Sequence, residues 1–152
     1  MSLFTRRRLI AAAPVSGLAA GAAVAFGPNA SAAAVAGLVE LVTPFRLQDS
    51  RVNEPDKYDT SAQDSLAVPG IDGKSGVILN VTVTETEGAG FFRVADAFEA
   101  VPTTSNINWY GDGQTLANMA IVMVAPPATG ITVQGGGDGR AHLVIDVLGF
   151  VA

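Results

Sequence analysis

The chain has 152 residues, no cysteine and a formal net charge of −5 at pH 7. This length accommodates one domain, and the lack of thiols excludes disulfide bonds and thiolate metal sites. The acidic balance argues against nucleic acid as a partner, because phosphate binding requires clustered Lys and Arg side chains.

The first segment has the layout of an export leader. Arg6, Arg7 and Arg8 precede the charge-free stretch 9–26, and the small residues 29–32 follow it. A cationic start, an apolar middle and a small-residue end are typical of secretory signals. Paired arginines ahead of aliphatic residues are typical of twin-arginine leaders. In this interpretation the leader is cleaved after its small residues, and the protein meets the membrane only during export.

The same segment has a second interpretation, in which residues 1–36 are retained as an arm. Ala and Gly let a backbone lie close against a neighbouring protein. Ordering an arm costs about 1–2 kcal/mol per residue, so its contacts must be extensive. A membrane anchor is a third interpretation, although an Ala- and Gly-rich stretch is only marginally apolar. We expect a basic, Ala/Gly-rich arm or leader over 1–36 and one β-sandwich domain over 37–152.

Beyond residue 37, short β-branched segments alternate with Gly and Pro turns. This pattern predicts strands, and short strands joined in this way predict an all-β, antiparallel sandwich or barrel-like domain. Single helical turns are expected at 95–100 and 114–119, and a solvent-exposed loop at 53–69. The predicted strands span residues 39–42, 77–84, 90–94, 106–110, 120–124, 130–134 and 142–148.

Several longer motifs occur in a fixed order along this domain. They are P-F-R-L-Q-D-S-R at 44–51, V-I-L-N-V-T-V-T at 77–84, P-T-T-S-N-I-N at 102–108, G-Q-T-L-A-N at 113–118 and H-L-V-I-D-V-L-G-F at 142–150. Together they resemble a β-rich module of exported actinobacterial surface proteins and actinobacteriophage structural proteins. The pattern of that module reads P-x-R-L-L-D-T-R, V-L-N-V-T-V-T, T-S-N-L-N, G-Q-T-x-A-N and D-V-x-G-Y.

The resemblance implies a non-enzymatic accessory or structural role, because such modules typically accompany catalytic domains or cell-wall proteins. The chain departs from the family in two ways. It carries one copy of a module that often occurs in tandem. Residues 93–98 read R-V-A-D-A-F, where the family more often continues with a Tyr-Pro step.

His142 and Asp146 are the residues that most suggest catalysis. They lie four residues apart in a predicted strand and so point to the same face, and a His–Asp pair suggests general-base chemistry. The sequence contains no cysteine and no Gly-x-Ser-x-Gly nucleophile motif. We therefore interpret His142 as a structural, hydrogen-bonded residue, and we expect no catalytic residue, no cofactor and no enzyme activity.

Charged residues at both ends of the predicted domain form a second candidate site. Arg46, Asp49, Arg51 and Asp146 would cluster where the first segment meets the last strand. Such a cluster can bind an anion, or it can act as an ion-pair lock that fixes the register between the chain ends. We favour the lock.

Asparagine occurs repeatedly in the predicted strands, from which it is normally depleted. Asn80, Asn106, Asn108 and Asn118 could supply amide oxygens to calcium or to a sugar. Alternatively, they satisfy backbone groups where strands end or bulge. The neighbouring acidic residues lack the spacing of an EF-hand, so we favour the structural interpretation and expect no metal site.

A contact surface is predicted beside the turn at 111–113. Trp109 and Tyr110 are consecutive in a strand, so one faces the core and the other faces solvent. With Asn108 they form the predicted surface for contact with a sugar or a protein. Tyr110 is the residue that we expect to point outward.

These observations lead to two functional expectations. The first is a structural protein of an actinobacterial phage virion, either a capsid decoration or a minor tail protein. Residues 1–36, with Arg6, Arg7 and Arg8, would bind other virion proteins. The β-domain would form a homo-oligomer on the virion surface and could contact a host glycan or protein. The alternative is a twin-arginine-exported module that binds wall polysaccharide or a protein outside the cell or in the cell wall.

Overall fold

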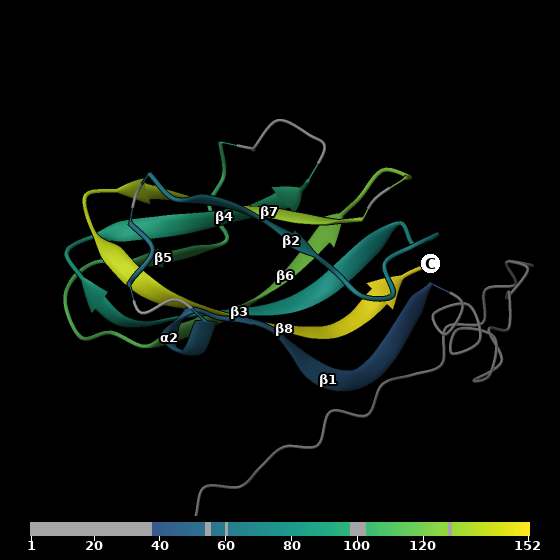
Figure 1. The fold of residues 1–152 in the computed structure, drawn as a ribbon, viewed down its shortest axis with the longest axis horizontal. Coiled ribbons are helices and arrows are strands. Elements are labelled where there is room, and N and C mark those ends of the chain that lie inside the picture. Colours follow the sequence, from purple (N-terminus) through teal and green to yellow (C-terminus); the bar gives the residue numbers. More distant parts are fainter. Residues whose placement is uncertain (1–37, 54–55, 60, 98–102, 128) are drawn as a thin grey trace, which may run out of the picture.

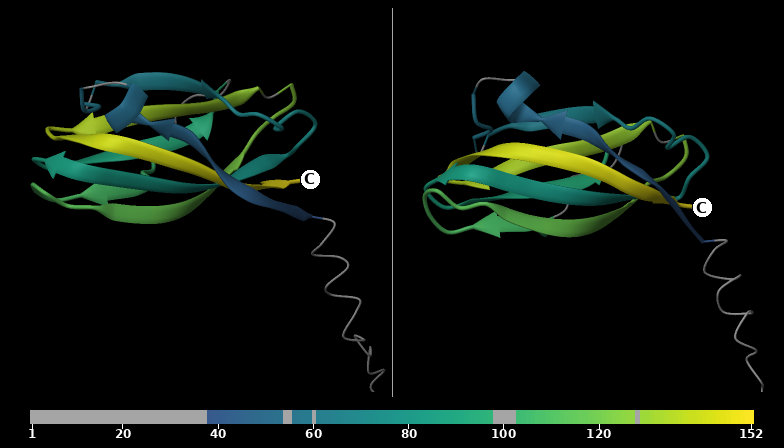
Figure 2. Two further views of the ribbon diagram at one scale, coloured as in Figure 1. Left: turned by 60° about the horizontal axis from the view of Figure 1, so that its bottom comes forward. Right: turned by 90° about the horizontal axis from the view of Figure 1, so that it is seen from below.

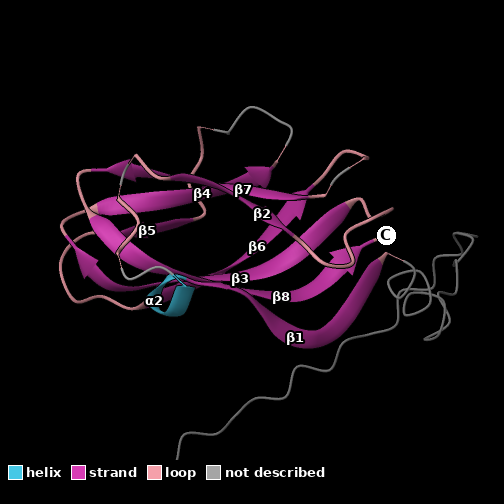
Figure 3. Ribbon diagram, viewed as in Figure 1, coloured by secondary structure: helices cyan, strands magenta, loops and turns pink. Residues whose placement is uncertain are grey.

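The computed structural model describes residues 38–53, 56–59, 61–97, 103–127 and 129–152. Residues 1–36, including Arg6, Arg7 and Arg8, therefore lie outside the described residues. Strands dominate the fold, and one short helix follows the first strand (Figure 3). The elements are β1 (Val39–Asp49), α2 (Ser50–Asn53), β2 (Gln63–Ala67), β3 (Gly76–Glu87), β4 (Gly90–Asp96), β5 (Ile107–Trp109), β6 (Leu116–Met123), β7 (Gly130–Gly137) and β8 (Arg140–Val151).

The strands form two four-stranded antiparallel sheets that pack on each other (Figures 1 and 2). One sheet has the order β1-β8-β3-β6, and the other has the order β2-β7-β4-β5. The prediction of an all-β, antiparallel sandwich is confirmed. The first and last strands are neighbours in this arrangement, because β1 pairs with β8.

Alternating apolar residues build the core between the sheets. On β3, every second residue from Val77 to Val83 is fully buried, because successive side chains of a strand point to opposite faces. Leu143, Ile145 and Val147 of β8 extend this layer. Phe92 and Trp109 of the other sheet pack against it, with their ring centroids 5.1 Å apart.

The two ends of the sandwich differ in what they carry. At the end that we call the terminal end, Ala152 N donates a hydrogen bond of 3.0 Å to Leu38 O, so the chain enters and leaves the described fold side by side. At the opposite, distal end lie the β3–β4 hairpin, the β7–β8 hairpin and the β5–β6 loop. Figure 1 shows these two ends on opposite sides of the view.

Some predicted boundaries are wrong. Strand β2 lies within the predicted loop 53–69, and β6 begins at Leu116, where a helical turn was expected at 114–119. In both places pairing with a neighbouring strand outweighs a weak local signal. Strand β1 continues past Pro44 to Asp49, and one of its register shifts, between Leu41 and Phe45, spans that proline, since a proline is tolerated on an edge strand or at a bulge.

Candidate functional site

Tyr110 projects from the distal end of the sandwich. Its side chain is 82% exposed, whereas that of Trp109 is 2% exposed. Tyr110 N donates to the Gln114 side-chain oxygen at 2.8 Å, and Gly113 N donates to Thr86 O at 2.7 Å. The β5–β6 loop is thus held against β3, which fixes the base of the exposed tyrosine.

Trp109 is a correction to the predicted contact surface. Its ring is in the core beside Phe92, so it supports the surface from below and cannot present its face to a partner. Alternation along the strand decides this, because only one of two consecutive residues can face solvent. Tyr110 takes that position, as expected, and Asn108 is also exposed.

Tyr110 borders a depression of about 270 Å³, which we call the distal depression. Three adjacent segments of the β2-β7-β4-β5 sheet form it, and its glycines leave backbone open to a ligand. The lining residues are Ala89, Gly90, Phe91, Asn108, Trp109, Tyr110, Gly137 and Asp138.

Phe91 lines this depression. The Arg93 guanidinium carbon lies 4.7 Å from the centre of the Phe91 ring, and Arg93 Nη1 donates to Gln134 Oε1 at 3.1 Å. On the neighbouring strand, Gly136 leaves room for the ring, because a Cβ there would lie 2.1 Å from Phe91 Cζ. The sequence signal for this contact is the spacing of Phe91 and Arg93, two residues apart and so on one face.

A second depression, of about 280 Å³, adjoins the first and shares Asp138 with it. Glu87 lies in it and forms ion pairs with Lys57 at 2.6 Å and Arg140 at 2.5 Å. The hydrogen bonds from Lys57 and Arg140 lower the pKa of the Glu87 carboxyl. The distal end therefore combines aromatic faces that can stack on a sugar ring or an apolar side chain with charged and amide groups that can hydrogen-bond to it.

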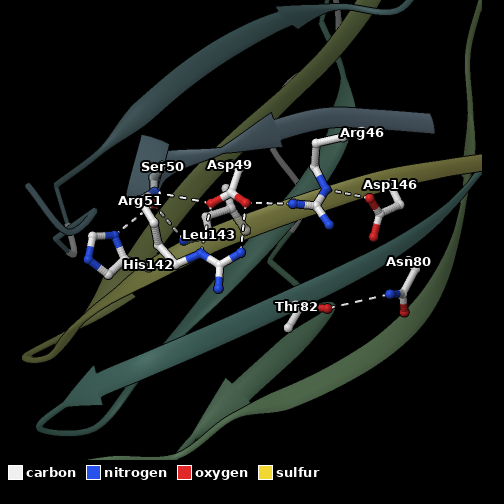
Figure 4. Close-up of polar contacts among 9 residues, drawn as sticks. All are labelled: Arg46, Asp49, Ser50, Arg51, Asn80, Thr82, His142, Leu143 and Asp146. Carbon is white, nitrogen blue, oxygen red and sulfur yellow. Dashed lines mark hydrogen bonds and ion pairs between the residues drawn. The ribbon is translucent and has the colours of Figure 1, made fainter. Parts of the chain in front are cut away.

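The four residues of the predicted lock form one ion-pair network (Figure 4). Arg46 lies between two carboxylates, with Nε 2.5 Å from Asp146 Oδ1 and Nη1 2.5 Å from Asp49 Oδ2. Arg51 Nη2 lies 2.7 Å from Asp49 Oδ2. The network links β1 to β8 at the Arg46–Asp146 pair of the register.

Asp49 is the buried centre of this network. The hydrogen bond from the Arg51 side chain is the main reason that the pKa of Asp49 is lowered to about 2. Both guanidinium groups are about half exposed, so each still contacts water. Because every charge has a partner of opposite sign, the arrangement suits a structural link better than an empty anion site.

His142 belongs to a separate buried link. Its Nδ1 lies 3.0 Å from Ser50 Oγ, and the same oxygen accepts a hydrogen bond of 2.9 Å from Leu143 N (Figure 4). Ser50 is fully buried, so its hydroxyl cannot reach a substrate. Asp146 is bonded to Arg46 and not to His142. This geometry supports the structural interpretation of the histidine, although no sequence pattern indicates its serine partner.

Two of the four asparagine side chains bond to backbone groups, and the other two bond to hydroxyl side chains. Asn106 Oδ1 accepts a hydrogen bond from Val94 N at 2.7 Å, and Asn118 Nδ2 donates to Asn106 O at 2.7 Å. The first bond lies within the β2-β7-β4-β5 sheet, and the second connects that sheet to β6 of the other. Asn80 Nδ2 donates to Thr82 Oγ1 at 3.4 Å, and Asn108 Oδ1 accepts from Ser105 Oγ at 2.9 Å.

Among the residues that the structure describes, no group of three His, Cys, Asp or Glu side chains could hold a metal ion, and no helix there is long and apolar enough to cross a membrane. Comparison with family models, with curated proteins and with solved structures gave no match.

Proposed function

We propose that the protein is a non-enzymatic structural component of an actinobacterial phage virion, a capsid decoration or minor tail protein. Residues 1–36 anchor it to the particle, and the β-sandwich is displayed outward. The proposal rests on the resemblance of the sequence motifs and on one structural observation, the opposite placement of the chain entry and the candidate contact surface.

This placement suits a display protein. The segment that follows the arm enters at the terminal end, beside Ala152, whereas Tyr110 and both depressions lie at the distal end. Strand β3 runs between the two ends with 12 residues, which corresponds to a length of about 40 Å. An anchored arm would therefore hold the contact surface well away from the particle.

The first test determines the residue at which the chain starts in purified particles. We expect intact mass measurement to find a chain that starts at Met1 or Ser2. We also expect a variant that lacks residues 2–36 to be lost from particles, because the anchor is removed. Full-length Tyr110→Ala is the matched control and should be incorporated normally, since its substitution is at the opposite end. Full incorporation of the truncated chain would contradict the anchoring role.

A second candidate function is favoured by the distal depression. In this alternative the leader is cleaved, and the exported domain binds wall polysaccharide through the exposed face of Tyr110 and through Asn108 and Asp138. The aromatic ring would stack on the apolar face of a sugar, while the amide and carboxylate would bond to its hydroxyl groups. The protein recovered from culture medium would then start near Ala33.

Binding to purified actinobacterial wall polysaccharide tests this alternative. Tyr110→Ala should weaken binding about tenfold or more, a loss equivalent to about 1.4 kcal/mol. Leu41→Ala is the control, because Leu41 is also largely solvent-exposed but lies on β1, away from the distal end. If both variants bind as the unmodified protein does, the distal depression is not a sugar site.

A further inference from the structure

Strand β6 is an edge strand whose outer face is apolar. It pairs with β3 on one side, and within the described part of the chain no strand pairs with its other side. Met119, Ile121 and Met123 project from it and are 63%, 57% and 61% exposed. These side chains alternate with inward-facing residues, of which Ala120 and Val122 are buried.

The hydrogen-bond alternation of the sheet fixes which backbone groups of β6 are free. Val124 N donates to Ser75 O at 2.9 Å, and the register from Gly76↔Met123 to Val83↔Leu116 has no shift. In an antiparallel ladder, residues that bond to a neighbour alternate with residues that point away from it. The N–H and C=O groups of Met123 and of every second residue back to Ala117 therefore point to the open edge.

The other three edge strands carry the usual protection against pairing, and β6 does not. Strand β1 contains Pro44, charged residues and two register shifts, β2 contains Asp64, and β5 has only three residues. Charges, prolines, bulges and short length are the features that block edge-to-edge association. Strand β6 has eight residues, no charge and no proline.

We propose that β6 pairs with β6 of a second copy of this chain, antiparallel about a two-fold axis near Ala120, so that two β1-β8-β3-β6 sheets become one continuous sheet. This register places Met119 opposite Ile121, two apolar side chains, and places the small Ala117 opposite the large Met123. The edge-facing N–H and C=O groups of each copy meet those of the other. The same surface serves both copies, as an isologous interface requires.

The charge distribution of the chain is also compatible with a second copy as the partner of β6. The chain has a net charge of −5, so two copies repel each other at long range, but β6 contributes no charge to the contact. Salt screens the long-range repulsion and strengthens apolar burial. The dimer should therefore tighten as the salt concentration rises, whereas a partner attracted by the acidic surface would be released.

The expected dimer is weak. A single strand pair with three exposed apolar side chains from each copy buries less than the roughly 1,200 Å² of a stable interface. In solution the dissociation constant should be in the range of about 10 µM to 1 mM. Copies anchored on one surface would experience an effective concentration in the millimolar range, where this contact is occupied. The dimer itself does not depend on the proposed virion role.

Analytical ultracentrifugation of the full-length protein, from about 5 µM to about 1 mM, tests the proposal. We expect a monomer–dimer equilibrium that Ile121→Lys weakens at least tenfold. The control is Leu41→Lys, which adds the same charge to the 75% exposed Leu41 on β1 and should leave dimerisation unchanged. Ile121→Pro is a second variant, because it removes an N–H that points to the open edge and leaves the pairing with β3 intact.

Amide hydrogen exchange gives an independent readout. The amides of Ala117, Met119, Ile121 and Met123 should exchange more slowly as protein concentration rises. The proposal is overturned by a monomer over the whole range, by equal effects of Ile121→Lys and Leu41→Lys, or by association that continues beyond a dimer. It is also overturned if deletion of residues 2–36 abolishes the dimer, since the arm and not β6 would then hold the two copies together.

Discussion

At the scale of single residues, Asp49 is a buried carboxylate held by several hydrogen bonds. Its carboxylate accepts two hydrogen bonds from the Arg51 side chain, at 2.8 and 2.7 Å, and a third from Arg46. Its pKa falls from 3.8 to about 2 as a result. A lowered folded-state pKa means that the native state binds the proton less tightly than the unfolded chain does, so protonation favours unfolding.

This shift predicts a window of acid sensitivity. The stabilisation by Asp49 is complete above about pH 4 and is lost as the pH falls toward 2. We expect the difference in unfolding free energy between the unmodified protein and Asp49→Asn to shrink by about 1–2 kcal/mol between pH 6 and pH 2, a range reduced for the exposure of the arginines. Urea denaturation at several pH values measures this difference.

The control for this experiment is Asp72→Asn, at an exposed position in the loop between β2 and β3. The difference in unfolding free energy between Asp72→Asn and the unmodified protein should not change between pH 6 and pH 2 in the way expected for Asp49→Asn. An Asp49→Asn protein that is destabilised equally at pH 6 and pH 2 would show that the carboxylate charge is not what the network stabilises.

At the scale of elements, two glycines allow close packing on opposite faces of the β4–β7 pair. A Cβ on Gly90 would lie 2.4 Å from Trp109 Cζ2 in the core, and a Cβ on Gly136 would lie 2.1 Å from Phe91 Cζ on the outer face. The two aromatic rings differ in how far they can move away from an added methyl group. Trp109 is enclosed, whereas Phe91 is only partly buried and can swing into solvent.

Substitution of each glycine by alanine should therefore have different effects. Gly90→Ala overpacks the core and should lower the unfolding free energy by about 1–3 kcal/mol. Gly136→Ala should cost less stability but displace Phe91 from Arg93, which changes the floor of the distal depression. Thermal denaturation of both variants, with near-ultraviolet circular dichroism to follow the aromatic rings, distinguishes the two. Equal destabilisation would mean that Phe91 is as confined as Trp109.

The strands with strong alternation were the elements that sequence could predict. Strands β3 and β8 are rich in β-branched residues that alternate along the chain, and the sequence predicts a strand in both places. Strand β2 reads Q-D-S-L-A and β6 begins L-A-N-M, which are poor in β-branched residues, so their conformation is decided by the partner strand rather than by local preference. The charged motif around Arg46 indicated a cluster with Asp146, and the register brings the two together.

The distal depression could not have been predicted from sequence. Its residues come from two hairpins and a loop that are far apart in the chain and meet only when both sheets are registered. Alternation along the strand predicts the exposed Tyr110, but no sequence pattern indicates that Phe91, Arg93 and Asp138 lie near it. Whether this surface binds a partner stays a prediction.

At the scale of the whole molecule, the described residues form a substantial hydrophobic core of their own. All members of the main hydrophobic cluster lie between Tyr58 and Phe150. We therefore expect a protein that lacks residues 2–36 to unfold cooperatively, with a midpoint within about 4 °C of the full-length protein, equivalent to less than 1 kcal/mol. Differential scanning calorimetry of the two proteins checks this, and a large drop would place part of the core in the arm.

The position of Leu38 beside the C-terminal Ala152 has a mechanical consequence. A load applied between residue 37 and Tyr110 runs along the strands, so it shears β1 against β8 and strains many ladder bonds at once. A load between residue 37 and Ala152 instead peels β1 away one pair at a time, starting at Val39↔Val151. Single-molecule pulling should need a distinctly higher force in the first geometry. A domain tethered at one end and pulled at the other would thus be loaded in its strongest direction.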